Sequence, residues 1–346
     1  MTSHGVRARR ASSIRLSLLW LSLTFVAACG GTLDAGSDRD PPLLPAGQQN
    51  PVILCNDGAF DNWQGEYAAL LASSGGPPLV GLVVSTGSEW TDLDAITSDW
   101  QRFALAARAS GLSETPDPVR SASVALRRPD DGDVASTVPN GSEGARFIVE
   151  TSSVFAEPGR PVAVVTGGRL TDIADAYLID PTIVDRVIVV SSLGSGFSGP
   201  QGVARMGGPN GELDSWASTI VVQKFRYVQV SARYEQLTDV PDERLDELPN
   251  NPFGDWMRAK QPEIFGITVA ADQVGVLALG VPGFIREVVR VSQSGWAGDQ
   301  PTLAADANGR AWLVTASDGA VATARFWRLL LDSATFAART GSAQSP

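Results

Sequence analysis

The sequence predicts an α/β fold with a mostly parallel central sheet and helices on both faces. Three short apolar runs, at 51–55, 79–85 and 186–191, have the length and composition of buried parallel strands. Segments with helical spacing of apolar residues follow the first two runs, at 63–73 and 92–110. This alternation is typical of a sheet covered on both sides, in which ligands bind beyond the carboxyl ends of the strands.

The later part of the chain continues this alternation. We expect further strands at 160–166, 218–222 and 227–231, helices at 170–178 and 271–279, a late antiparallel pair at 288–294 and 311–315, and a closing helix at 321–332. Residues 114–144 are rich in Pro, Asp and Ser, which predicts a loop over one face.

The first 29 residues are typical of a bacterial export signal. A basic start is followed by an apolar run at 16–27, which is too short to span a bilayer core of about 30 Å. The run ends in Val-Ala-Ala-Cys-Gly, which resembles a lipobox in which Cys29 receives lipid after cleavage. An ordinary signal peptide with a chance cysteine is the alternative. We expect an exported protein that is lipid-anchored to the bacterial cell envelope and has no other membrane contact.

Two regions follow the signal. Residues 30–50 are rich in Gly, Pro, Asp and Gln and contain few apolar residues, so they are expected to form a flexible tether. Residues 51–346 are expected to fold as one large α/β domain, because no second linker and no repeat interrupts them.

The charge and the histidine content exclude several functions. The formal net charge is −11, which disfavours nucleic acid and suits a small ligand or a bound cation. The only histidine is His4, in the signal, so Ser-His-Asp triads, Cys-His dyads and histidine-bound zinc are excluded. If Cys29 carries lipid, Cys55 has no partner for an internal disulfide. The oxygen ligands that remain suit Ca²⁺ or Mg²⁺.

The loop after the first expected strand carries the strongest candidate chemistry. Residues 55–63 contain two carboxylates, Asp57 and Asp61, and two amides, Asn56 and Asn62. Such a loop can hold a hard cation and direct a carboxylate at a substrate. Taken alone, it also fits a simple turn in which Asn62 caps the following helix.

Six segments in collinear order resemble the inosine-uridine nucleoside hydrolase family. They are 55–62, 81–88, 166–174, 179–187, 209–214 and 271–278. The first segment is similar to the family's Asp-x-Asp-Pro-Gly-x-Asp-Asp loop, in which Asp57, Asp61 and Asn62 match the last three acidic positions and Cys55 replaces the first. The resemblance extends from about residue 52 to about residue 330 and implies a nucleoside-hydrolase-like fold.

The resemblance also implies a cofactor and a catalytic residue. A Ca²⁺ ion would be bound by Asp57, Asn62, a backbone carbonyl near Thr166, and Asp272. Asp57 would take a proton from a water that the ion acidifies, and that water would attack the anomeric carbon of a ribosyl group.

The substrate contacts follow from the same resemblance. Asp61 and Asn210 would hydrogen-bond the ribose hydroxyls, and Ser88 stands where the family has an asparagine near the substrate. The implied partner is a small nucleoside or related N-riboside, and a homo-oligomer is possible by analogy with the family.

Three departures from the family pattern leave two functions open. Asn62 replaces an aspartate, Ser88 replaces an asparagine, and Ala271 replaces a histidine. The chain is therefore either a hydrolase that cleaves an N-glycosidic bond with a Ca²⁺-bound water, or a catalytically degenerate surface lipoprotein that binds a ribose- or nucleoside-like ligand without turnover. Trp63, at the start of a helix, either packs outside the cleft or narrows it.

Overall fold

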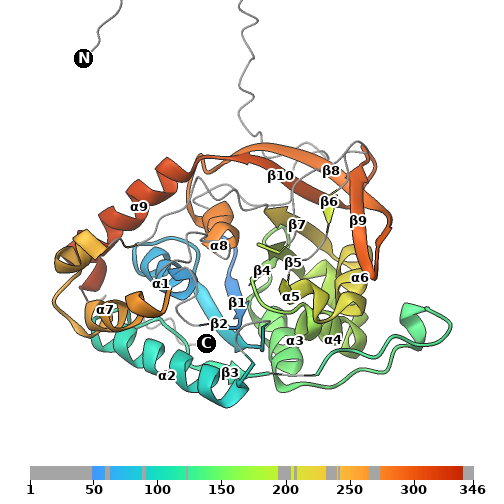
Figure 1. Cartoon of the computed structure of the whole chain (residues 1–346), viewed down its shortest axis with the longest axis horizontal. Helices are drawn as coiled ribbons and strands as arrows, with labels where there is room; N and C mark the ends of the chain where they lie inside the picture. Colours follow the sequence, from blue (N-terminus) through green and yellow to red (C-terminus); the bar gives the residue numbers. More distant parts are fainter. Residues whose placement is uncertain are drawn as a thin grey trace, which may run out of the picture. The chain divides into compact units, whose positions relative to one another are not determined.

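A 10-stranded sheet forms the centre of the part of the chain that the computed structural model describes (Figure 1). Its order is β3-β2-β1-β4-β5-β7-β10-β8-β9-β6. The strands are β1 (Val52–Asn56), β2 (Leu79–Val84), β3 (Pro118–Arg120), β4 (Val162–Thr166), β5 (Val187–Ser191), β6 (Ala204–Arg205), β7 (Arg226–Val230), β8 (Ile285–Ala297), β9 (Gln300–Ala305) and β10 (Ala311–Ser317). The described residues are 49–58, 63–87, 91–121, 124–193, 204–205, 209–230, 240, 242–264 and 273–337.

The sheet is parallel from β3 to β10 and antiparallel beyond it. β1 pairs in parallel with β2 and β4, and the parallel pairing continues through β5 and β7 to β10. β8, β9 and β6 then extend the sheet in antiparallel pairs. The prediction of a mostly parallel sheet with a late antiparallel pair is therefore confirmed by β8 and β10. β9 is an additional strand, which lies between these two in the sequence and beyond β8 in the sheet.

Helices cover both faces of this sheet (Figure 1). The α-helices are α1 (Gln64–Ser73), α2 (Leu93–Ala109), α3 (Glu143–Phe155), α4 (Thr171–Ile179), α5 (Pro209–Glu212), α6 (Ser215–Lys224), α7 (Pro252–Ile264), α8 (Gln273–Gly280) and α9 (Gly319–Leu331). Short 3₁₀ helices are η2 (Val134–Ser136), η3 (Pro181–Asp185), η5 (Asp242–Glu247) and η6 (Ser333–Phe336).

Two hydrophobic clusters lie on the two faces. Side chains alternate along β1, so that Leu54 belongs to the cluster that includes residues of α1, α2, α7, α8 and α9, whereas Ile53 belongs to the cluster that includes residues of α3, α4 and α6. Both residues are at most 1% exposed. The predicted coverage of the sheet by helices on both faces is thereby confirmed. Because both faces are apolar, polar side chains can gather only beyond the ends of the strands.

Trp63 lies inside the first of these clusters. Its side chain is fully buried against the α1 face of the sheet, so it packs in the hydrophobic core. Its backbone is left-handed, with φ 56° and ψ 28°, which costs an aromatic residue roughly 1–3 kcal/mol. The burial of the indole therefore holds a strained turn at the point where the chain enters α1.

One element expected from the sequence is wrong. Residues 218–222, expected as a strand, lie inside α6, which begins after Asp214 accepts a hydrogen bond from the backbone amide of Ala217 at 2.9 Å. Residues 216–222 are buried throughout, and a short run that is buried on all sides does not distinguish a helix from a strand. The expected loop at 114–144 contains β3 and η2, and α3 and α7 are helices that the sequence analysis did not anticipate.

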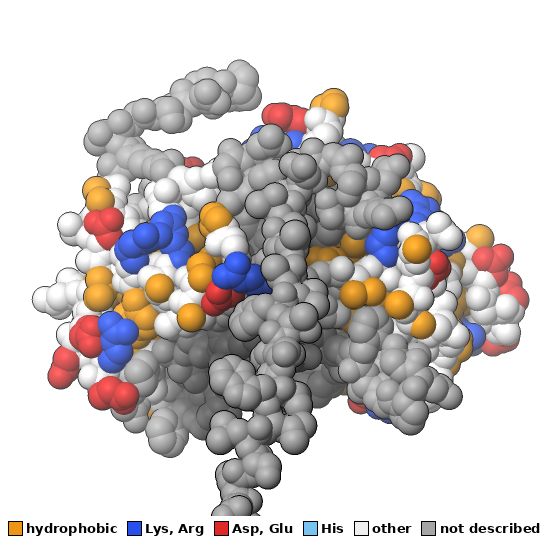
Figure 2. Space-filling model, turned by 90° about the horizontal axis from the view of Figure 1, so that it is seen from above, with side chains coloured by type: hydrophobic (Ala, Val, Ile, Leu, Met, Phe, Trp, Pro, Cys, Tyr) orange, Lys and Arg blue, Asp and Glu red, His pale blue; other side chains and the backbone are white. Residues whose placement is uncertain are grey.

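The expected signal and most of the expected tether lie outside the described residues. Contacts divide the chain into two units, Met1–Asp34 and Ala35–Pro346, and every described residue belongs to the second. Among the described helices, none has both the length and the apolar character needed to cross a membrane. On the face drawn in Figure 2, Lys and Arg side chains of the described residues lie scattered among acidic and apolar ones.

Candidate functional site

The parallel strands end at one level, and polar residues follow them there. The register pairs Cys55 with Thr166, and Thr166 with Ser191, so β1, β4 and β5 end side by side. Asn56 is paired with Val84 at the end of β2. Residues that follow these strands therefore meet at one edge of the sheet, where a parallel α/β sheet binds its ligands.

Asp57 occupies the centre of this edge. It directly follows β1 and is 1% exposed. Its backbone carbonyl accepts a hydrogen bond of 2.7 Å from Nε1 of Trp100, a buried residue of α2. This bond fixes the backbone of Asp57 from the α2 side, so its carboxylate is held by the fold rather than carried on a mobile surface loop.

Asn210 joins Asp57 to the segment after β4. Its Nδ2 donates to Oδ2 of Asp57 at 3.2 Å and to the carbonyl of Gly167 at 3.0 Å. Two residues that lie far apart in the sequence, both expected in the site, are thus in direct contact. Both hydrogens of the Asn210 amide have protein acceptors in this arrangement.

Two glycines permit this close packing. A Cβ atom on Gly87, after β2, would overlap Oδ2 of Asp57 and lie 2.9 Å from Oδ1 of Asn210. A Cβ atom on Gly168 would lie 2.5 Å from Oγ of Ser85 and 3.2 Å from the backbone nitrogen of Asp57. Side chains at these two positions would displace the groups around the carboxylate.

The backbone carbonyl of Thr166, an expected metal ligand, already accepts two hydrogen bonds. Both come from Ser192, from its backbone amide at 3.0 Å and from its hydroxyl at 3.1 Å. A carbonyl oxygen has two lone pairs. A cation at this oxygen would therefore have to replace at least one donor of Ser192.

Other oxygen atoms at the same edge are suited to a hard cation or to its water. The hydroxyls of Ser85 and Thr86 are buried after β2 and have no hydrogen-bond partner among the described residues. Together with the Asp57 carboxylate they are the type of donor that Ca²⁺ prefers. Within the described ranges, no group of three or more His, Cys, Asp or Glu side chains is arranged to hold a metal ion.

Cys55 lies in the strand below Asp57 and differs from these oxygen donors. The side chain is fully buried. Burial raises the pKa of its thiol, and the negative charges of Asp172 and Asp57 raise that pKa further. The thiol therefore stays protonated and is a poor ligand for a hard cation.

A second pair of buried carboxylates, Asp214 and Asp172, borders the site. The sequence did not indicate a functional role for them. Asp214 is 3% exposed and accepts hydrogen bonds of 2.8 Å from the hydroxyl of Thr171 and from the amide of Leu126. Burial raises the pKa of its carboxyl, and these hydrogen bonds oppose that rise. Asp172 is fully buried and accepts from Ser142 at 2.8 Å and from Ser121. In the sequence, Thr171 and Asp172 lie in the matching segment 166–174, and Asp214 ends the matching segment 209–214.

Several residues expected in the site lie outside the described residues. They are Asp61, Asn62, Ser88 and Asp272, together with Ala271 and the lipidation candidate Cys29. Their roles remain predictions. The structure brings Asp57, Asn210 and Thr166 to one edge of the sheet.

Glu66 is a buried acid close to this edge, in the first turn of α1. It is fully buried, and its Oε1 accepts a hydrogen bond of 2.7 Å from Nε1 of Trp256 on α7. Its Oε2 has no hydrogen-bond partner among the described residues. Burial raises the pKa of Glu66 from about 4.5 to about 8, against the smaller effects of the Trp256 hydrogen bond and of Lys260. The folded protein therefore holds a proton on Glu66 at neutral pH.

This proton makes the stability of the fold depend on pH. The pKa of Glu66 is higher in the folded protein than in the unfolded chain, so protonated Glu66 stabilises the fold. This contribution is complete below about pH 4.5 and is lost as the pH rises to about 8. Glu66→Gln mimics the neutral acid. We expect its free energy of unfolding at pH 8–9 to exceed that of the wild type by about 4 kcal/mol. Urea unfolding between pH 5 and 9 measures this difference. Glu143→Gln, an exposed acid in the first turn of α3, should follow the wild type. A constant difference between Glu66→Gln and wild type across this range would contradict the prediction.

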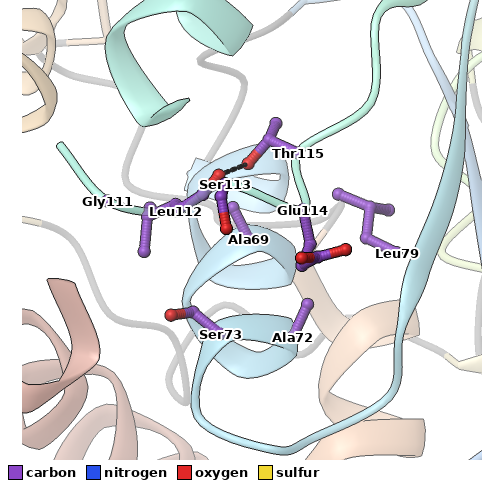
Figure 3. A pocket seen from close by; sticks show the side chains of 9 residues that line it. All are labelled: Ala69, Ala72, Ser73, Leu79, Gly111, Leu112, Ser113, Glu114 and Thr115. Atoms are coloured by element: carbon purple, nitrogen blue, oxygen red, sulfur yellow. Dashed lines mark hydrogen bonds between the residues drawn. The ribbon is translucent and has the colours of Figure 1, made fainter. Parts of the chain in front are cut away.

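The described cavities lie away from this edge. The pocket in Figure 3 is lined by α1, by Leu79 at the start of β2, and by residues 111–115, and its volume is about 10 Å³. That is room for about one water. A larger hollow of about 680 Å³ is lined by residues 75–77, before β2, and by parts of α8 and α9. Both lie toward the end of the sheet where β2 begins, opposite the edge that carries Asp57.

The structure is similar to solved nucleoside hydrolases, although the sequence alone matches no family model and no curated protein. An inosine-guanosine nucleoside hydrolase aligns over 82% of this chain and 98% of its own, with 17% identity and a TM-score of 0.57. A plant nucleoside hydrolase aligns over 83% and 99%, with 15% identity and a TM-score of 0.55. The inosine-uridine preferring enzyme of Bacillus anthracis aligns over 83% and 100%, with 14% identity and a TM-score of 0.52. At these identities the likeness shows the fold, which is nucleoside-hydrolase-like.

Proposed function

We propose that this protein hydrolyses the N-glycosidic bond of a nucleoside or a related N-riboside. The observation that carries the proposal is the buried Asp57 carboxylate at the carboxyl edge of the sheet, in contact with Asn210 and enclosed by Gly87. The nucleoside-hydrolase-like fold supports the same reaction class. Nucleoside hydrolysis needs a proton acceptor and hydroxyl-binding groups close together, and these residue types supply both.

We further propose Ca²⁺ as the cofactor. Asp57, Asn62 and Asp272 would hold the ion, and the Thr166 carbonyl would join them only by releasing a donor of Ser192. The buried hydroxyls of Ser85 and Thr86, near the carboxylate, are compatible with a hydrated cation. When bound, the ion supplies a water of lowered pKa.

The residues of the chain then have distinct tasks. Asp57 accepts the proton of the attacking water, since a carboxylate held in place by Trp100 and Asn210 is already oriented for this transfer. Asp61 and Asn210 bind ribose hydroxyls, and Ser88 lies beside the substrate. In this proposal the domain is exported and held at the cell envelope by lipid on Cys29.

Base release and calcium content, measured on the same purified sample, test the proposal. We expect release of base from inosine, uridine or a nitrophenyl riboside, with about one calcium ion per chain. Removal of the ion by a chelator should reduce base release to background, because the water acidified by the ion is lost. Added Ca²⁺ should restore base release.

A different result supports the alternative function. If ribose or a nucleoside raises the melting temperature of the calcium-loaded protein and no base is released, the protein is a ligand-binding lipoprotein without turnover. The absence of both binding and release would contradict the two functions together.

A further inference from the structure

Arg169 lies in a short segment whose flanking residues contact two buried carboxylates, Asp57 and Asp214. On one side, Gly168 packs against Asp57, where a Cβ atom would lie 3.2 Å from the Asp57 nitrogen. On the other side, Thr171 donates a hydrogen bond of 2.8 Å to Asp214. Arg169 itself is half-buried, and its Nε atom is fully buried. Arg169 therefore lies between the residues that contact Asp57 and Asp214, and its Nε atom is shielded from solvent.

The charges around this side chain are mainly negative. Burial lowers the pKa of the Arg169 guanidinium, and the charges of Asp214, Asp57 and Asp172 raise it, with Asp214 the strongest. These three carboxylates are at most 3% exposed. Buried carboxylates are expensive to ionise unless an opposite charge lies near them.

We propose that Arg169 is a built-in counter-cation for Asp57 and Asp214, and that it weakens the binding of a divalent cation to Asp57. The inference rests on the proposed function, because it takes Asp57 as a cation ligand. The guanidinium and a divalent ion stabilise the same negative charge, and they repel each other at short range. The protein therefore tolerates the cation-free state better than a site made of carboxylates alone.

The test compares three variants of the mature protein, with CaCl₂ as the only added ligand. Arg169→Met removes the charge and keeps an unbranched apolar side chain, and Arg169→Lys keeps the charge. Arg226→Met is the matched control, because Arg226 is also half-buried beside one acid, Asp185, but stands at the start of β7, away from the site. Calcium affinity is measured by titration calorimetry, and the melting temperature is measured with and without calcium.

We expect Arg169→Met to bind Ca²⁺ at least about tenfold more tightly than the wild type. Without calcium its melting temperature should fall below that of the wild type, and calcium should raise it by more than it raises the wild type. Arg169→Lys should stay close to the wild type in calcium affinity, because it retains the charge. Arg226→Met can lose stability, but its calcium affinity should not change.

Other outcomes overturn the inference. Equal calcium affinity in Arg169→Met and wild type, or no calcium binding by either, contradicts the role of Arg169 as a counter-cation. A gain in affinity that Arg169→Lys shares would mean that packing, and not charge, is responsible. The proposed function is tested separately, by base release. A protein that binds calcium in this pattern but releases no base would contradict the hydrolase function and not the role of Arg169.

Discussion

Asp57→Asn is expected to lower base release at least about a thousandfold and to leave the fold intact. Asparagine has almost the same size as aspartate, and its side-chain oxygen can still accept the hydrogen bond from Nδ2 of Asn210. The variant loses the negative charge and the proton acceptor together. Steady-state base release at saturating calcium measures the effect, and circular dichroism and the melting temperature check the fold.

Asp175→Asn provides the matched control for this experiment. Asp175 is also a fully buried aspartate, but it accepts hydrogen bonds from the backbone amides of Ser142 at 2.8 Å and Gly141 at 3.1 Å. Its replacement should lower the melting temperature without lowering the activity of each folded molecule. If Asp57→Asn retains more than about a tenth of the activity, Asp57 is not the proton acceptor.

Gly87→Ala is expected to disrupt the candidate site although it adds only one methyl group. The new Cβ atom would overlap Oδ2 of Asp57, so either the carboxylate or the turn after β2 must move. Overpacking of a buried site costs about 1–3 kcal/mol, and a displaced carboxylate should lower base release by about a hundredfold or more. Urea unfolding and base release measure the two effects.

Gly295→Ala is the control for the added methyl group. Gly295 lies in β8, where the nearest atom to a new Cβ would be Oγ1 of Thr302 at 3.6 Å, an ordinary contact. This variant should keep wild-type activity and close to wild-type stability. Full activity in Gly87→Ala would show that the contact between residue 87 and Asp57 has no functional weight.

Much of the fold could be predicted because periodicity and composition determine it locally. The apolar runs at β1, β2, β4 and β5 indicated buried parallel strands, and the level ends of such strands indicated where a site would form. The error at α6 has the same origin, since a run buried on all sides carries no periodicity to distinguish helix from strand.

The site could be predicted only in part. The sequence pointed to Asp57 and Asn210, and the structure brings these two side chains into contact. It did not indicate that Gly87 encloses the carboxylate, that Ser192 holds the Thr166 carbonyl, or that Arg169 borders two buried acids. These relations depend on distances between segments remote in sequence, which spacing along one segment does not encode.

The burial of Cys55 gives the domain an internal reporter. It is the sole thiol in residues 51–346, and it lies fully shielded under Asp57 with its pKa raised. An alkylating reagent can reach its sulfur only in molecules whose sheet edge has transiently opened. The rate of labelling under native conditions therefore measures the free energy of that opening, at the strand that carries the proposed catalytic carboxylate.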